Sequence, residues 1–109
     1  MTVKELCEIC NFEICCMPFP EREVKGAYIG DLLSWVMGRA NEDNAWITIM
    51  SNVNVIAVAT LADTSCVILA EGVKLEQDII DVANEKGVNI LYSSLPSFET
   101  AVKISGKVL

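Results

Sequence analysis

The sequence predicts an α/β fold in which a parallel or mostly parallel sheet of about five strands is flanked by helices. From Val24 onward, short apolar stretches alternate four times with longer stretches of helical length. Connections this short that contain a helix join parallel strands, and the helices pack on the faces of the sheet. No linker interrupts the pattern, and a chain of 109 residues has the size of one domain. We therefore predict a single domain over residues 1–109.

A helix and a strand precede this repeating part. Thr2, with a glutamate three residues later, has the spacing of a capping box, and apolar residues at positions 3, 6, 7 and 10 form one helical stripe. Alternation over residues 12–16 predicts a strand in which Phe12, Ile14 and Cys16 share one face. Two prolines then end the strand, because proline cannot donate to a strand ladder.

Four strand–helix units follow. Strands are expected over residues 24–29, 45–50, 65–70 and 88–92, and helices over residues 31–40, 55–63, 75–86 and 98–107. The 65–70 stretch lacks alternation, as central parallel strands do. The 75–86 helix ends at Gly87, a typical C-cap. The β-branched content of residues 55–63 leaves a strand open as the alternative there.

The helix over residues 31–40 carries a candidate interface. We expect Asp31 to cap this helix, and the core to be faced by Leu32, Leu33, Val36 and Met37. Trp35 then points outward, and an exposed tryptophan beside Met37 is typical of an interface. We interpret this face as the interface of a homodimer. Partial burial of Trp35 at the edge of the monomer core is the alternative.

The charge balance argues against some classes of binding partner. Fifteen acidic and eight basic residues give a formal charge of −7, which repels phosphate backbones and anionic headgroups. Nucleic acid and membranes are therefore not expected partners. No apolar run is long enough to span a bilayer, and the first residues do not resemble a signal peptide, so the cytoplasm is the expected location. The lack of histidine removes the commonest general base and metal ligand.

Polar residues follow three of the expected strands, where the carboxyl ends of parallel strands meet. Open α/β sheets bind ligands at this edge, because backbone N–H groups and helix N-termini converge there. Arg22, in the loop before the first unit, would bind an anionic group through bidentate hydrogen bonds. The predicted ligand-binding residues are Arg22, Gly30, Asp31, Ser34, Ser51, Asn52, Asn54, Glu71 and Gly72. For the single residues Asp31, Ser51 and Asn52, capping of a helix is the alternative.

The order and spacing of several segments resemble the DRTGG domain, which occurs alone in small bacterial and archaeal proteins and within some phosphotransacetylases. The fold is similar to that of the N-terminal, non-catalytic domain of HPr kinase/phosphorylase. The matching segments are residues 21–26, 28–34, 46–49, 54–59, 67–72, 87–91 and 97–101. The resemblance implies a regulatory module that senses a nucleotide or metabolite, or docks on a partner enzyme. It implies no catalytic residue.

One departure from the family bears on the site. Ala70-Glu71-Gly72 stands where Thr-Gly-Gly is expected. A Thr-Gly-Gly turn offers a hydroxyl and open backbone amides, which suit an anion such as a phosphate. A glutamate at the centre of the turn places a carboxylate there instead, which argues against a phosphate cradle.

Two alternatives from other functional classes stay open. One alternative is an iron–sulfur or zinc site formed by four thiols that are close in sequence, those of Cys7, Cys10, Cys15 and Cys16. Their spacing is unusual for such clusters, and cysteines on an apolar stripe are more often core residues, so we predict no metal and no cofactor. The other alternative is a histidine-free enzyme that uses Asp31 or Glu71 as acid or base. The P-loop that a kinase would need is absent.

Overall fold

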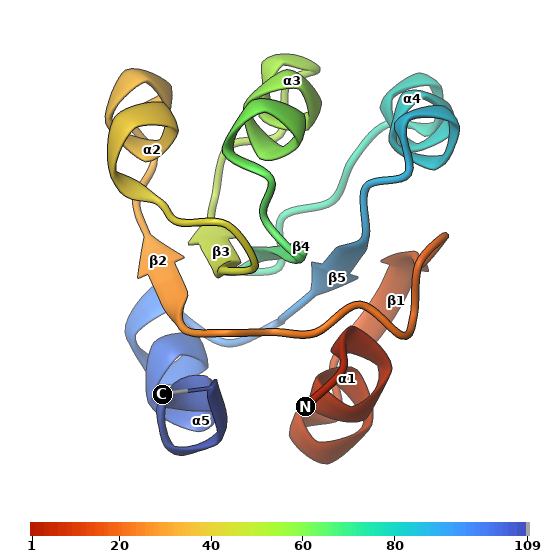
Figure 1. The fold of residues 1–109 in the computed structure, drawn as a ribbon. Coiled ribbons are helices and arrows are strands. Elements are labelled where there is room, and N and C mark those ends of the chain that lie inside the picture. Colours follow the sequence, from red (N-terminus) through yellow and green to blue (C-terminus); the bar gives the residue numbers. More distant parts are fainter. Residues whose placement is uncertain (109) are drawn as a thin grey trace.

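The computed structural model describes residues 1–108. Its helices are α1 (Val3–Cys10), α2 (Leu33–Arg39), α3 (Asn54–Ala62), α4 (Gln77–Lys86) and α5 (Ser97–Val108), and its strands are β1 (Glu13–Cys16), β2 (Ala27–Ile29), β3 (Ala45–Thr48), β4 (Cys66–Leu69) and β5 (Ile90–Tyr92). Helices α2, α3 and α4 cover one face of the sheet, and α1 and α5 cover the other (Figure 1). None of the helices in residues 1–108 combines the length and apolar character that crossing a membrane requires.

The strands form one sheet in the order β1-β5-β4-β3-β2. Strands β2 to β5 are parallel, and β1 pairs with β5 in the antiparallel sense. The predicted mostly parallel sheet is therefore confirmed, and so is the helix at α3, where a strand was the alternative. Strand β2 is shorter than expected, because Gly26 has a φ of +76° and the backbone N–H of Val24 bonds to Met1 O at 2.9 Å instead of entering the ladder.

Side chains of the central strands alternate between two cores, one on each face. Ile47 and Ile68 pack with the α1 and α5 side, whereas Trp46 and Val67 pack with the α2, α3 and α4 side. Trp46 is fully buried, and its indole N–H donates to Gly30 O at 2.9 Å. A sheet covered on both faces explains why its strands read as apolar runs without alternation.

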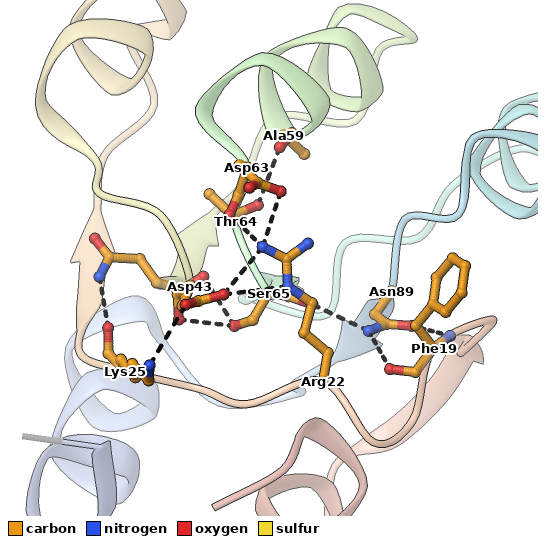
Figure 2. Close-up of polar contacts among 10 residues, drawn as sticks. Phe19, Arg22, Lys25, Asp43, Ala59, Asp63, Thr64, Ser65 and Asn89 are labelled. Atoms are coloured by element: carbon orange, nitrogen blue, oxygen red, sulfur yellow. Dashed lines mark hydrogen bonds and ion pairs between the residues drawn. The ribbon is translucent and has the colours of Figure 1, made fainter.

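The connection from β1 to β2 crosses the sheet along its amino edge, because these strands lie at opposite ends of the strand order (Figure 1). Two side chains hold this segment in place (Figure 2). Asn89 is buried; its Nδ2 donates to Phe19 O at 2.8 Å and to Ser65 O at 3.0 Å, and its Oδ1 accepts from Phe19 N–H at 2.9 Å. Arg22 forms ion pairs with Asp43 at 3.1 Å and Asp63 at 2.9 Å.

The prediction that Phe12, Ile14 and Cys16 share one face of the first strand is wrong. Phe12 packs in the core beside α1 and α5, Cys16 packs in the opposite core, and Ile14 is 56% exposed. A β-bulge between Ile14 and Cys16 shifts the pairing with β5. An extra residue in one strand interrupts the two-residue period on which the prediction rested.

The expectations for α2 are partly wrong. The helix begins at Leu33 and has no side-chain cap, so Asp31 does not cap it. Val36 is fully buried and Leu33 packs against the core, but Leu32 and Met37 are exposed. Trp35 points outward as predicted, with 52% of its surface exposed and the Arg39 guanidinium 3.7 Å from its ring centroid.

Candidate functional site

The turns that follow the parallel strands lie side by side along the carboxyl edge of the sheet, as the sequence predicts. The backbone N–H of Ala70 donates to Thr48 O at 3.1 Å, which joins the corner after β4 to that after β3. The backbone N–H of Glu71 donates to Leu95 O at 2.8 Å, which joins it to the corner after β5. Polar residues far apart in the sequence therefore share one edge.

Asp31 ties the corner after β2 to that after β3. Its Oδ1 accepts hydrogen bonds from the Thr48 hydroxyl at 2.8 Å and from the backbone N–H of Ile49 at 3.0 Å. The same hydroxyl accepts a bond from Met50 N–H at 3.2 Å. Asp31 thus has a structural role in fixing this corner, which the sequence reasoning did not identify.

The other predicted residues near this corner are Gly30, Ser34, Ser51, Asn52 and Asn54. The two serines and the two asparagines are exposed. The side-chain oxygen of Asn52 accepts a bond from Asn54 N–H at 2.9 Å, so Asn52 forms a turn that leads into α3. The N-cap of this helix is Val53, without a side-chain cap bond, so the capping alternative is wrong for Asn52. At Gly30, a Cβ would lie 3.1 Å from the Tyr28 ring, which favours glycine there on steric grounds.

The Ala70-Glu71-Gly72 turn is closed by its own contacts. Glu71 and Gly72 both have positive φ, +62° and +73°, and the Gly72 N–H donates to Ser93 O at 3.1 Å. The Glu71 carboxylate accepts a hydrogen bond from Ser97 N–H, the first residue of α5, at 2.9 Å. Both amides of this turn are already bonded and its carboxylate occupies a helix N-terminus, which is why the turn is not a phosphate cradle.

Arg22 does not lie with the other predicted residues. It is at the amino edge, where its guanidinium bonds Asp43 Oδ1 and also donates to the Asp63 backbone oxygen at 2.6 Å (Figure 2). Asp43 lies two residues before β3 and Asp63 three residues before β4, at the ends of these strands farthest from Asp31 and Glu71. Two aspartates of the same chain therefore fill the role that we assigned to an anionic ligand.

A cavity of about 320 Å³ opens at the carboxyl edge beside β5, and we call it the carboxyl-edge cavity. The corner after β5 forms one wall, and the end of α1 with the start of β1 forms another. Its lining is Cys10, Asn11, Phe12, Glu13, Gly72, Lys74, Tyr92, Ser93, Ser94, Leu95 and Lys103. Of the nine predicted residues, Gly72 lines this cavity, whereas Asp31 and Glu71 do not.

Two lysines give the cavity a cationic character in an otherwise acidic chain. Lys74 forms an exposed ion pair with Glu13 at 3.0 Å, and its ammonium lies 4.0 Å from the centroid of the Tyr92 ring. Lys103 is exposed on α5 and forms no ion pair within residues 1–108. An exposed pair such as Lys74–Glu13 contributes about 0–1 kcal/mol, so an anion can replace Glu13 at little cost.

The sequence reasoning missed Asn11, Lys74, Ser94 and Lys103. Asn11 and Lys103 lie outside the strand-to-helix turns, whereas Lys74 and Ser94 lie in the turns after β4 and β5. The cavity forms because β1 is antiparallel, which brings the start of β1 and the end of α1 to the carboxyl edge of the parallel strands. Lys74, which follows β4, was a usable signal in a chain with only eight basic residues.

The structure divides the four cysteines of the metal hypothesis between the two faces of the sheet. Cys7 and Cys10 are buried in the core beside α1 and α5, whereas Cys15 and Cys16 pack on the opposite core. Within residues 1–108, no group of three or more cysteine, aspartate or glutamate side chains is arranged to hold a metal ion. The proposed four-cysteine site is therefore not formed.

Comparison with known proteins places this fold in a family. A search of curated proteins finds no match. A similar solved structure contains the CBS and DRTGG domains of the regulatory region of Clostridium perfringens pyrophosphatase, complexed with the activator diadenosine tetraphosphate. It has a TM-score of 0.69 at 16% identity; the match covers 94% of this chain but only 45% of that one. The model of the DRTGG domain matches residues 5–106, so the chain belongs to the DRTGG domain family.

Proposed function

We propose that this domain is a regulatory module that binds a small anionic ligand, a nucleotide or a phosphorylated or carboxylated metabolite, in the carboxyl-edge cavity. The observation that carries the proposal is the placement of Lys74 and Lys103 around one cavity in a chain of net charge −7. The exposed amide of Asn11 and hydroxyl of Ser94 add hydrogen-bonding groups to its lining. The volume lies at the lower end of the range of ligand pockets, about 300–1,000 Å³.

The similar pyrophosphatase region supports a regulatory role. Its DRTGG domain occurs beside CBS domains in a regulatory region crystallised with a nucleotide activator. The present chain spans less than half of that region, so the activator and the enzyme are properties of the larger protein. By analogy, we propose that this domain acts on a partner enzyme. The cytoplasmic location expected from the sequence stays a prediction.

We also propose that the domain forms a homodimer through the outer face of α2. Three large apolar side chains on or next to this helix are about half exposed, namely Leu32 at 57%, Trp35 at 52% and Met37 at 49%. Aromatic and methionine side chains are enriched in protein interfaces. Sedimentation of the wild type and of Trp35→Ser tests this proposal: a dimer that the substitution dissociates supports it, and a wild-type monomer at high concentration contradicts it.

The ligand proposal is tested by thermal denaturation in the presence of nucleoside phosphates, dinucleoside polyphosphates and central carboxylate metabolites. A ligand that binds only the native state at 100 times its Kd stabilises the domain by about 2.7 kcal/mol, and the melting temperature rises accordingly. Lys74→Met and Lys103→Met should remove the shift. Lys86→Met, which changes an exposed lysine at the end of α4 outside the cavity lining, should leave it intact.

Each outcome of this test is informative. A ligand whose shift survives both lysine substitutions binds elsewhere and overturns the cavity as the site. If no anion in the panel shifts the wild-type melting temperature, the proposal of an anionic small-molecule ligand fails. The dimer proposal stands or falls separately, because α2 contributes no residue to the cavity lining.

A further inference from the structure

The β-bulge in β1 places two adjacent thiols on the same face of the sheet. In a regular strand, Cys15 and Cys16 would point to opposite faces. Here the pairing shifts between Ile14 and Cys16, and both sulfurs pack on the core formed with α2, α3 and α4. Two neighbouring residues that share one face are what a bulge of this kind produces.

The two thiols differ in access to solvent. Cys15 is partly exposed at the edge strand, whereas Cys7, Cys10, Cys16 and Cys66 are buried. Cys16 is held by the hydrogen bond that its thiol donates to Val88 O at 3.4 Å. A reagent in solution therefore reaches Cys15 and finds Cys16 behind it.

A hydroxyl and an ammonium group complete the surroundings of Cys15. Tyr92, in the strand paired with β1, is fixed because its oxygen accepts a hydrogen bond from Leu75 N–H at 3.1 Å. Lys74 stacks its ammonium on the Tyr92 ring and pairs with Glu13, two residues from Cys15. The charged and titratable neighbours of Cys15 are thus Lys74, Tyr92, Cys16 and Glu13.

We propose that Cys15 is a modification site, a nucleophilic thiol that undergoes exchange with small-molecule disulfides. The inference rests on the bulge that pairs it with Cys16, on its exposure, and on the tyrosine and lysine beside it. It does not depend on a ligand in the carboxyl-edge cavity.

The electrostatic surroundings favour the reactive thiolate. Contact with the neighbouring Cys16 lowers the pKa of the Cys15 thiol, partial burial opposes this, and the Tyr92 hydroxyl and Lys74 lower it further, to about 7. The pKa of Cys16 is raised by the same contact with Cys15 and by burial, so Cys16 stays protonated. The thiolate is the species that attacks a disulfide.

The exchange is balanced without any further reactant. The Cys15 thiolate attacks one sulfur of the small-molecule disulfide, and a new S–S bond forms as the original one breaks. The leaving thiolate departs and takes a proton from water according to its own pKa. The protein thiol is oxidised to a mixed disulfide, and one half of the reagent is reduced to the free thiol.

The test exposes the native wild-type protein to glutathione disulfide over a range of pH and locates the adduct by peptide mapping. We expect one adduct per chain, on Cys15. The rate should rise tenfold per pH unit below about pH 7 and level off above it, following the thiolate fraction. At pH 7 the reaction should be about threefold faster than that of a free cysteine, because the larger thiolate fraction outweighs the weaker nucleophilicity.

Two matched variants make the test specific. Tyr92→Phe removes one donor and should move the inflection of the rate to higher pH, whereas Lys86→Met, which changes a lysine that is not among the charged neighbours of Cys15, should leave it unchanged. An adduct that forms first on another cysteine overturns the proposal. So does a rate that keeps rising to about pH 9, as for an ordinary thiol, or the absence of an adduct from the wild type.

Discussion

The Glu71 carboxylate accepts a hydrogen bond from the backbone N–H of Ser97 at 2.9 Å, from the turn after β4 to the first residue of α5. The first N–H groups of a helix lack partners inside it, and the helix dipole favours negative charge at that end. Glu71 supplies both an acceptor and a charge, while its own backbone adopts a left-handed conformation with φ of +62°. A long-range cap thus accounts for the glutamate at this turn.

We expect Glu71→Ala to destabilise the domain by about 1 kcal/mol, because the cap is lost and the left-handed conformation remains. Glu71→Gln keeps a hydrogen-bond acceptor and should cost less. Glu71→Gly loses the cap but relieves the backbone conformation, so its stability should lie close to that of the wild type. Urea denaturation of the three variants measures this order, and equal losses in all three would contradict the assigned cap.

Arg22 is predicted to stabilise the fold rather than to bind a ligand. Arg22→Met should cost about 2 kcal/mol, because hydrogen bonds to charged groups contribute about 1.5–3 kcal/mol and Asp43 and Asp63 would lose their shared cation. Arg22→Lys keeps the charge but not the planar fork, so an intermediate loss is expected. Chemical denaturation tests both variants.

A second measurement separates this role from ligand binding. Anion binding to Arg22→Met should keep the wild-type affinity at a temperature where the variant is folded. A variant that loses binding without losing stability would place the site at the amino edge instead.

The sequence was sufficient for the fold because its signals are local. The capping box at Thr2, the alternation of strand and helix patterns and the C-cap at Gly87 all appear in the structure at the expected places. The errors arise where a distant contact decides the outcome. The bulge in β1 depends on pairing with β5. Asp31 accepts hydrogen bonds from Thr48 and Ile49 instead of capping α2.

The candidate site was only partly predictable for the same reason. Convergence of the strand ends follows from parallel pairing, so Gly72 was found at the cavity. Lys103 reaches it from the last helix and Asn11 from the end of the first, and no local pattern relates these two positions. The pairing of Arg22 with Asp43 and Asp63 likewise depends on a segment that crosses the whole sheet.

Burial of Cys66 predicts a loss of stability at alkaline pH. Burial raises the pKa of this thiol to about 12, opposed by a hydrogen bond with Ser65. Between the ordinary pKa of about 8.5 and about 12, the unfolded state releases a proton that the folded state retains, so stability falls as pH rises. The contribution of Cys66 to this loss should be about 1–2 kcal/mol by pH 10.

Comparison with Cys66→Ala isolates this effect. The variant is less stable at every pH because it loses buried volume, but its stability should decline less steeply between pH 8 and pH 10. The slope of the unfolding free energy against pH is the measurement, and parallel slopes for the two proteins would show that Cys66 ionises equally in both states.

Substitution of Asp31 tests which part of the carboxyl edge binds the ligand, the carboxyl-edge cavity or the corner between β2 and β3. Asp31→Asn keeps an oxygen that can accept from Thr48 and Ile49, so its unfolding free energy should change by less than about 0.5 kcal/mol, whereas Asp31→Ala should lose about 1 kcal/mol. If the ligand binds in the carboxyl-edge cavity, the affinity of Asp31→Asn for an anion that shifts the wild type should be unchanged, because Asp31 is not part of the lining. Calorimetric titration of Asp31→Asn and of Lys103→Met with the same anion decides between these two sites. Loss of binding in the aspartate variant with retention in the lysine variant would move the site to the corner between β2 and β3.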